Sequence, residues 1–170
     1  MNITNIGLQC LQEPSAGMLS KEDLHFFYYD ISVSVLTGVS AIFNWDVKID
    51  EYISSRSIIV DNVDLNNVPT SYIENTVLFY VEDRKESKAM SFFRHLRNAF
   101  SHYRISRYND EYFIKDMYED KSNSGEIIRR INTMVGRIKC EDLHQLYYLF
   151  MKQKERHEQE SITTLDYQKS

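Results

Sequence analysis

The sequence is poor in the residues that form tight turns. Its 170 residues include 5 glycines and 2 prolines. Sandwiches and barrels of many short strands need many such residues, so this scarcity argues against them and favours long helices. No run approaches the ~20 consecutive apolar residues of a transmembrane helix, and the N-terminus lacks the basic and apolar regions of a signal peptide. A cytoplasmic protein with Cys10 and Cys140 as free thiols is therefore expected.

The chain has the length of one domain. Hydrophobic residues make up 42% of it and charged residues 26%, which excludes wholesale disorder. No internal repeat or linker points to a second domain. We expect one helical domain over residues 1–153, followed over residues 154–170 by a polar tail that is frayed.

Charge is distributed unevenly along this acidic chain. The net charge is −5, yet residues 84–107 contain seven basic residues and only one acidic residue, Glu86. We call this range the basic window. The basic residues are Arg84, Lys85, Lys88, Arg94, Arg97, Arg104 and Arg107. Such a segment is either a solvated helix face or a place that holds phosphate.

Apolar spacing predicts the secondary structure. A helix over 21–44, opened by Ser20, is followed by helices over 70–81, 87–101, 127–138 and 142–152. Residues 57–60 suit either a short strand or a buried loop, and alternating residues around Asn109-Asp110 predict a β-hairpin over 103–119. The expected fold is all-α, a bundle of four to five helices with one inserted hairpin.

The helix over 87–101 carries the most information about function. On a helical wheel, Ala89, Phe92, Phe93, Leu96, Ala99, Phe100 and Tyr103 form a core sector, and the opposite sector holds Arg94, His95, Arg97, Asn98, Ser101, His102 and Arg104. Arginine, histidine and asparagine form directed hydrogen bonds, and arginine matches phosphate oxygens in pairs. A solvated basic face and an anion site remain the two alternatives.

The run Arg97-Asn98-Ala99-Phe100-Ser101-His102 resembles the R-N-x-x-x-H signature of the HEPN superfamily. Its flanks, Arg94-His95-Leu96 and Tyr103-Arg104, are also similar to small stand-alone HEPN proteins of bacteria and plasmids. The resemblance implies an all-helical domain and a metal-independent endoribonuclease, with no cofactor, in which the RNA 2′-hydroxyl attacks phosphorus and leaves a 2′,3′-cyclic phosphate.

The same resemblance assigns roles to residues. His102 would transfer protons, Arg97 would stabilise the phosphate, and Asn98 would orient His102 or bind phosphate. The neighbouring substrate contacts would come from Arg94, Ser101, Tyr103 and Arg104. A homodimer would supply the second proton-transfer group, and a toxin or anti-phage role, with a cognate antitoxin, follows from the same likeness.

Two other functional classes stay open. One is a non-catalytic HEPN-like module that binds RNA, a nucleotide or a partner protein through this face, and the other is a purely structural helical protein. The sequence has no phosphate-binding loop, dinucleotide-binding or hydrolase motif, and no metal-ligand spacing. His144 is expected to be an interface histidine without a metal.

Overall fold

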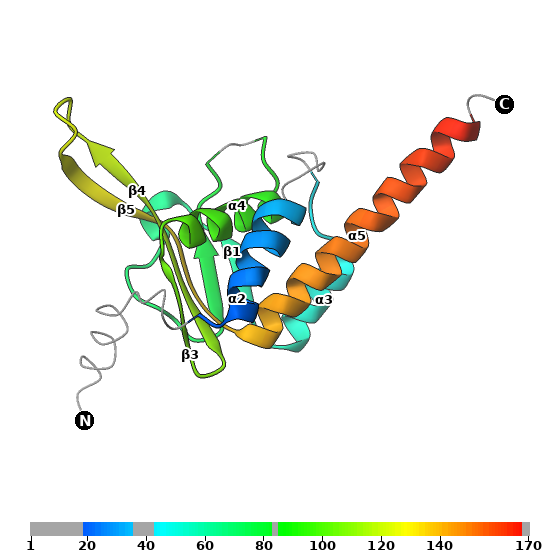
Figure 1. Cartoon of the computed structure of the whole chain (residues 1–170), viewed down its shortest axis with the longest axis horizontal. Coiled ribbons are helices and arrows are strands. Elements are labelled where there is room, and N and C mark those ends of the chain that lie inside the picture. Colours follow the sequence, from blue (N-terminus) through cyan, green and yellow to red (C-terminus); the bar gives the residue numbers. More distant parts are fainter. Residues whose placement is uncertain (1–18, 36–42, 83–84, 168–170) are drawn as a thin grey trace.

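The structure is a computed structural model that describes residues 19–35, 43–82 and 85–167 (Figure 1). Its elements in chain order are α2 (Lys21–His25), η1 (Phe26–Val35), α3 (Val47–Ser55), β1 (Ile59–Asn62), η2 (Leu65–Asn67), β2 (Thr76–Phe79), α4 (Lys88–Ser101), β3 (Ile105–Tyr108), β4 (Glu111–Lys121), β5 (Ile127–Lys139) and α5 (Cys140–Tyr167). Cys10 and residues 36–42, part of the helix predicted over 21–44, lie outside the described residues.

A five-stranded sheet forms the centre of the molecule, so the predicted all-α bundle is wrong. The strands lie in the order β1-β2-β5-β4-β3. β1 and β2 are parallel, and all other neighbours are antiparallel. The helices α2, α4 and α5 lie over one face of this sheet (Figure 1). The fold class is therefore mixed α and β.

Two segments predicted as helices are strands. Residues 127–138 lie in β5, and the end of the segment 70–81 forms β2. In β5 the side chains of Met134 and Ile138 are buried on the helix-covered side, opposite Asp116 and Tyr112 of β4. The apolar spacing suited both a helix and a strand, but the many β-branched residues favour the strand.

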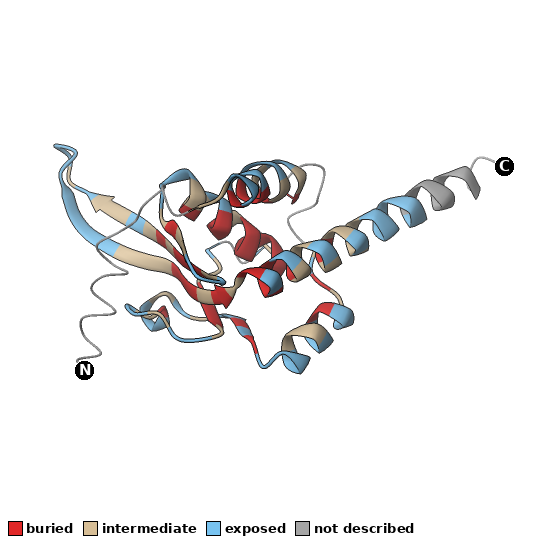
Figure 2. Ribbon diagram, turned by 60° about the horizontal axis from the view of Figure 1, so that its bottom comes forward, coloured by how far each residue is buried: buried red, intermediate tan, exposed pale blue. Residues whose placement is uncertain are grey.

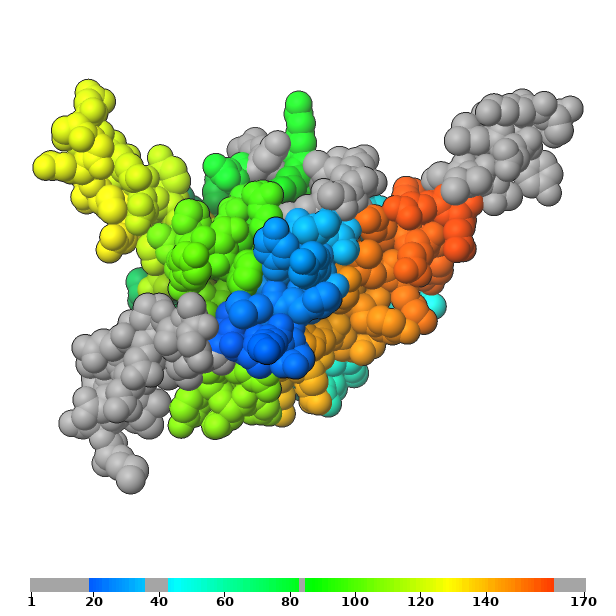
Figure 3. Space-filling model, viewed as in Figure 1, coloured from blue at the N-terminus to red at the C-terminus, as the bar shows by residue number. Residues whose placement is uncertain are grey.

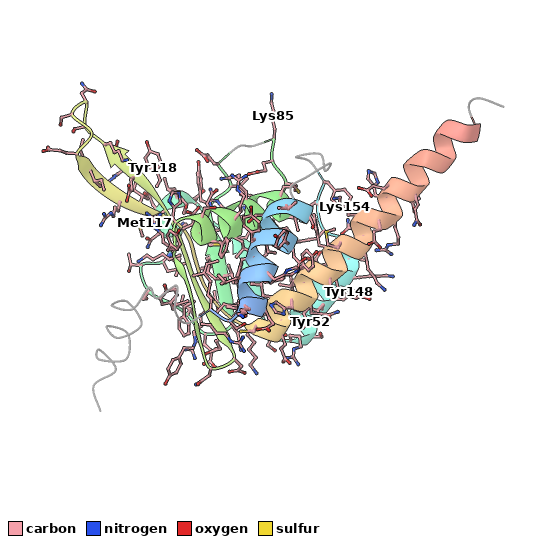
Figure 4. All side chains as sticks on the ribbon, viewed as in Figure 1. Tyr52, Lys85, Met117, Tyr118, Tyr148 and Lys154 are labelled. Atoms are coloured by element: carbon pink, nitrogen blue, oxygen red, sulfur yellow. The ribbon has the colours of Figure 1, made fainter. Side chains whose placement is uncertain are left out.

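The hairpin predicted over 103–119 is confirmed. β3 pairs with β4 through a turn at Asn109, whose φ of 54° is left-handed. β4 ends at Lys121, two residues beyond the predicted hairpin, and pairs with β5 along most of its length. The outer parts of these two strands project from the body as a two-stranded arm (Figures 1 and 3), where Figure 4 labels Met117 and Tyr118.

Three predicted helices are present, two of them with changed lengths. Ser20 caps α2 through a reciprocal pair of hydrogen bonds with Asp23. The helix then continues as η1, a π-helix, and residues 43 and 44 are not helical. α4 matches the predicted range of 87–101. α5 runs on to Tyr167, well past Lys152, and its outer part projects from the body (Figure 1).

The core lies between the sheet and the helices that cover it (Figure 2). Phe92 of α4 packs against Phe79 of β2, with ring centroids 5.7 Å apart. On the same face of the sheet, Gly136 lies opposite Val77 so closely that a Cβ atom there would come within 2.9 Å of the valine methyls. The core therefore holds α4 firmly and determines which of its residues reach solvent.

Candidate functional site

The helix α4 presents the predicted motif. Ser87 caps its N-terminus, with Oγ accepting a hydrogen bond from the Met90 amide at 3.1 Å. The side predicted to face the core is buried at Ala89, Phe92, Phe93, Leu96 and Ala99. The opposite side carries the candidate site, but two residues of the helical wheel were assigned to the wrong side: His95 is buried, and Tyr103 is 72% exposed.

His95 is a structural residue that joins α4 to the sheet. Its Nδ1 lies 2.7 Å from Asp116 Oδ2, and its Nε2 lies 2.6 Å from the carbonyl oxygen of Tyr80. A carbonyl only accepts, so Nε2 must carry a hydrogen, and Nδ1 shares a second with the carboxylate. Thr133 and the Met117 amide also donate to Asp116. The pair is fully satisfied inside the protein.

Two of the arginines predicted to bind phosphate are already neutralised. Arg94 forms a bidentate ion pair with Glu86, with nitrogen–oxygen distances of 2.9 to 3.1 Å. Arg104 donates to the Met117 carbonyl and to Glu119. Both side chains are less than one-quarter exposed. They shape the surroundings of the site and are not freely available to a ligand.

The rest of the basic window is largely paired as well. Lys88 contacts Asp61, and Arg107 contacts Asp23, while Arg84 lies outside the described residues. Arg97 is exposed, and its one recorded contact within the described residues is a 3.3 Å hydrogen bond from Nη2 to Asn98. Among the described arginines of this segment, Arg97 is therefore the one that is fully exposed, while Arg107 is partly exposed.

The predicted residues at the end of α4 form a small exposed surface. Arg97, Ser101 and His102 are exposed and Asn98 is half-buried. Within the described part of the chain, the His102 imidazole has no recorded hydrogen bond or ion pair. Asn98 lies one residue after Arg97 and one helical turn before His102, so these side chains occupy neighbouring stripes of α4. We call Arg97, Asn98, Ser101, His102 and Tyr103 the α4-end surface.

Tyr103 adopts an unusual conformation at this helix end. The Tyr103 amide bonds to the Phe100 carbonyl at 3.0 Å and the Arg104 amide to the Ala99 carbonyl at 2.8 Å, the pattern of a Schellman cap. Such caps favour glycine at the left-handed position, yet here the φ of Tyr103 is 56°. The strained residue also exposes its aromatic ring, a combination that is typical of functional positions.

The described residues hold no group of three or more His, Cys, Asp or Glu arranged to bind a metal ion. Likewise, no helix in the described ranges is long and apolar enough to cross a membrane. Comparison of the chain with models of protein families, with curated proteins and with solved structures finds no match. The α4-end surface must therefore be judged on its own geometry.

Proposed function

We propose that the protein binds single-stranded RNA at the α4-end surface. The observation that carries this proposal is the exposure, within one helix end, of a cation, an imidazole and an aromatic ring. Arginine binds phosphate oxygens, and exposed tyrosines stack on unpaired bases. Arg97 would hold a phosphate, Tyr103 would stack on an adjacent base, and Asn98 and Ser101 would supply hydrogen bonds.

Cleavage of the bound RNA is the second function, favoured by the position of His102. Its imidazole is exposed and free of charged partners in the described structure, and it lies on the stripe of α4 next to that of Arg97, the cation that would hold the phosphate. His102 would take the proton of the 2′-hydroxyl as its oxygen attacks phosphorus, and Arg97 would stabilise the charge on the phosphate. The bond from phosphorus to the 5′-oxygen then breaks, which leaves a 2′,3′-cyclic phosphate.

The leaving 5′-oxygen also needs a proton. A single imidazole can return the proton that it took, or a second copy of the chain can supply another His102. A homodimer that brings two α4-end surfaces together is therefore part of the cleavage proposal. A cytoplasmic toxin or anti-phage role and a cognate antitoxin are further proposals, which the HEPN resemblance implies and which require that the RNA is cleaved.

A labelled single-stranded RNA separates binding from cleavage. Fluorescence anisotropy measures binding, and gel analysis with chelator present measures cleavage and its end groups. We expect Arg97→Ala and Tyr103→Ser to weaken binding, and His102→Ala to reduce cleavage by ~10²–10⁴-fold with binding nearly unchanged. Arg129→Ala, which removes an exposed arginine of β5, is the matched control.

The outcomes distinguish the two functions. Binding without cleavage by the wild type would leave the protein as an RNA-binding module. If Arg97→Ala weakens binding no more than Arg129→Ala does, the α4-end surface is not the RNA site. Equal cleavage by wild type and His102→Ala would exclude His102 as the catalytic residue.

A further inference from the structure

A chain of three hydrogen-bonded side chains joins α2, β4 and α5. The Tyr112 hydroxyl bonds to Asp23, and its oxygen lies 3.1 Å from His144 Nε2. Asp23 is 1% exposed and Tyr112 is fully buried, whereas His144 reaches the surface. The three residues are distant in the sequence and belong to no motif. The sequence therefore predicts only an ordinary interface histidine at His144.

Asp23 is held in its ionised form. Burial would raise the pKa of Asp23, but hydrogen bonds from Tyr112, the Ser20 amide and Arg107 outweigh burial and lower it. The Ser20 amide donates at 2.8 Å, and Arg107 Nη1 lies 3.1 Å from both carboxylate oxygens. Burial and the Asp23 contact raise the pKa of Tyr112, so its hydroxyl keeps its proton.

These protonation states determine the form of His144. An ionised carboxylate only accepts, so the Tyr112 hydroxyl donates to Asp23 and can only accept from His144. The hydrogen of the neutral imidazole must then lie on Nε2, which leaves the lone pair on Nδ1. Partial burial, with the Phe26 ring centroid 4.1 Å away, lowers the pKa of His144, although Asp23 and Asp30 oppose this and Arg107 adds to it. The ring is thus neutral at pH 7.

Arg107 binds the same carboxylate as Tyr112, and its charge acts on His144. It contacts Asp23 through Nη1 and the Asn109 carbonyl through Nε at 3.0 Å. Its Nη2 group makes no recorded hydrogen bond within the described residues, and the side chain is 35% exposed. A partly exposed guanidinium with an unused nitrogen is suited to bind an oxyanion.

We propose that His144 and Arg107 form an acid–base site for a phosphate-bearing substrate, separate from the α4-end surface. Arg107 Nη2 binds the phosphate, and His144 Nδ1 takes a proton from a hydroxyl of the substrate. In that step the O–H bond breaks, an N–H bond forms, and the electron pair stays on the substrate oxygen. Asp23 stabilises the resulting imidazolium through Tyr112, which makes Asp23 and Tyr112 positioning residues.

Nitrogen NMR of the uniformly labelled full chain tests this site, with inorganic phosphate as the probe. We expect the wild-type His144 ring to carry its hydrogen on Nε2, and its signals and those of Arg107 to shift saturably with phosphate. Tyr112→Phe keeps the buried ring and removes the hydroxyl, so His144 should then exchange between both tautomers. A purely structural role for Tyr112 would not predict this change.

Two further variants test the role of the cation. Arg107→Lys keeps a charge beside Asp23 but removes the guanidinium fork, and we expect at least ~10-fold weaker phosphate binding at His144. Arg129→Gln should leave binding unchanged. An Nδ1–H tautomer in the wild type, or no saturable shift of His144, would overturn the proposal. Phosphate effects at His102 report on the α4-end surface, so the two proposals can fail independently.

Discussion

His95 and His102 lie seven residues apart in the same basic segment, yet their surroundings are opposite. His95 is 2% exposed, with both ring nitrogens bonded to groups on the sheet. His102 caps the end of α4, is exposed, and has no recorded side-chain partner in the described structure. The first histidine secures the helix, and the second is available to a ligand.

The sheet causes this difference. α4 packs on β4, so its middle turns meet polar groups of the sheet as well as apolar ones. A helix wheel drawn for a bundle places every polar residue on the solvent side and therefore misplaces His95. At the end of α4 the chain turns into β3, and the side chains next to this turn do not pack against the sheet.

Replacing the buried histidine should have the largest effect. His95→Ala leaves Asp116 buried without its imidazole partner, and breaking a buried pair in this way typically costs about 3–5 kcal/mol. Urea unfolding followed by circular dichroism measures the loss. His102→Ala is the matched control on the same helix and should change stability by less than about 0.5 kcal/mol. Equal losses in the two variants would contradict the assigned roles.

Local signals in the sequence predicted only part of this arrangement. Ser20, the core face of α4 and the hairpin at Asn109 each depend on neighbouring residues. The cap and the hairpin are confirmed, and the core face is confirmed except at Tyr103 and His95. The pairing of β5 with β2 and β4 depends on residues far apart in the chain, and apolar spacing alone did not reveal it. The partners of Arg104 lie on β4 and depend on the register of the hairpin, whereas Glu86, the partner of Arg94, lies eight residues away in the same basic window.

The second largest effect on stability is expected at Asp23, a buried carboxyl group like Asp116, the partner of His95. Its folded-state pKa lies below the usual 3.8, so its contribution to stability is present above about pH 4 and is lost as pH falls below that value. We expect Asp23→Asn to cost about 1.5–3 kcal/mol at neutral pH, the usual value of hydrogen bonds to a charged group. As the pH is lowered from 6 to 2.5, the free energy of unfolding of Asp23→Asn should then fall less steeply than that of the wild type.

The exposed Asp64 provides the control for this measurement. It precedes η2 without a side-chain capping hydrogen bond, so Asp64→Asn should retain the acid dependence of the wild type. If Asp23→Asn and Asp64→Asn give the same pH profile, the carboxylate of Asp23 is not the group whose titration destabilises the fold.

A smaller effect is expected at the strained end of α4. A residue with a side chain costs about 1–2 kcal/mol in the left-handed conformation, so Tyr103→Gly should stabilise the fold by about 1 kcal/mol. The same change should weaken RNA binding, because it removes the exposed ring. Thermal unfolding and anisotropy on one preparation measure both. Weaker binding without added stability would show that the cap carries no strain.

The smallest effect is expected from a variant that tests whether the ion pairs of Glu119 lower the affinity for RNA. Glu119 holds Arg104 and Arg130 at 3.3 Å each, and Arg104 directly follows the α4-end surface. Glu119→Gln removes the charge that restrains Arg104 and should strengthen RNA binding about two- to fivefold, since such partly exposed pairs are worth up to about 1 kcal/mol.

The exposed Glu126 lies on the same arm without a recorded ion pair in the described chain, so Glu126→Gln makes the same charge change away from Arg104. Equal gains in both variants would show that net charge alone, and not the release of Arg104, controls the affinity. A gain confined to Glu119→Gln that disappears in salt would place Arg104 at the edge of the RNA site.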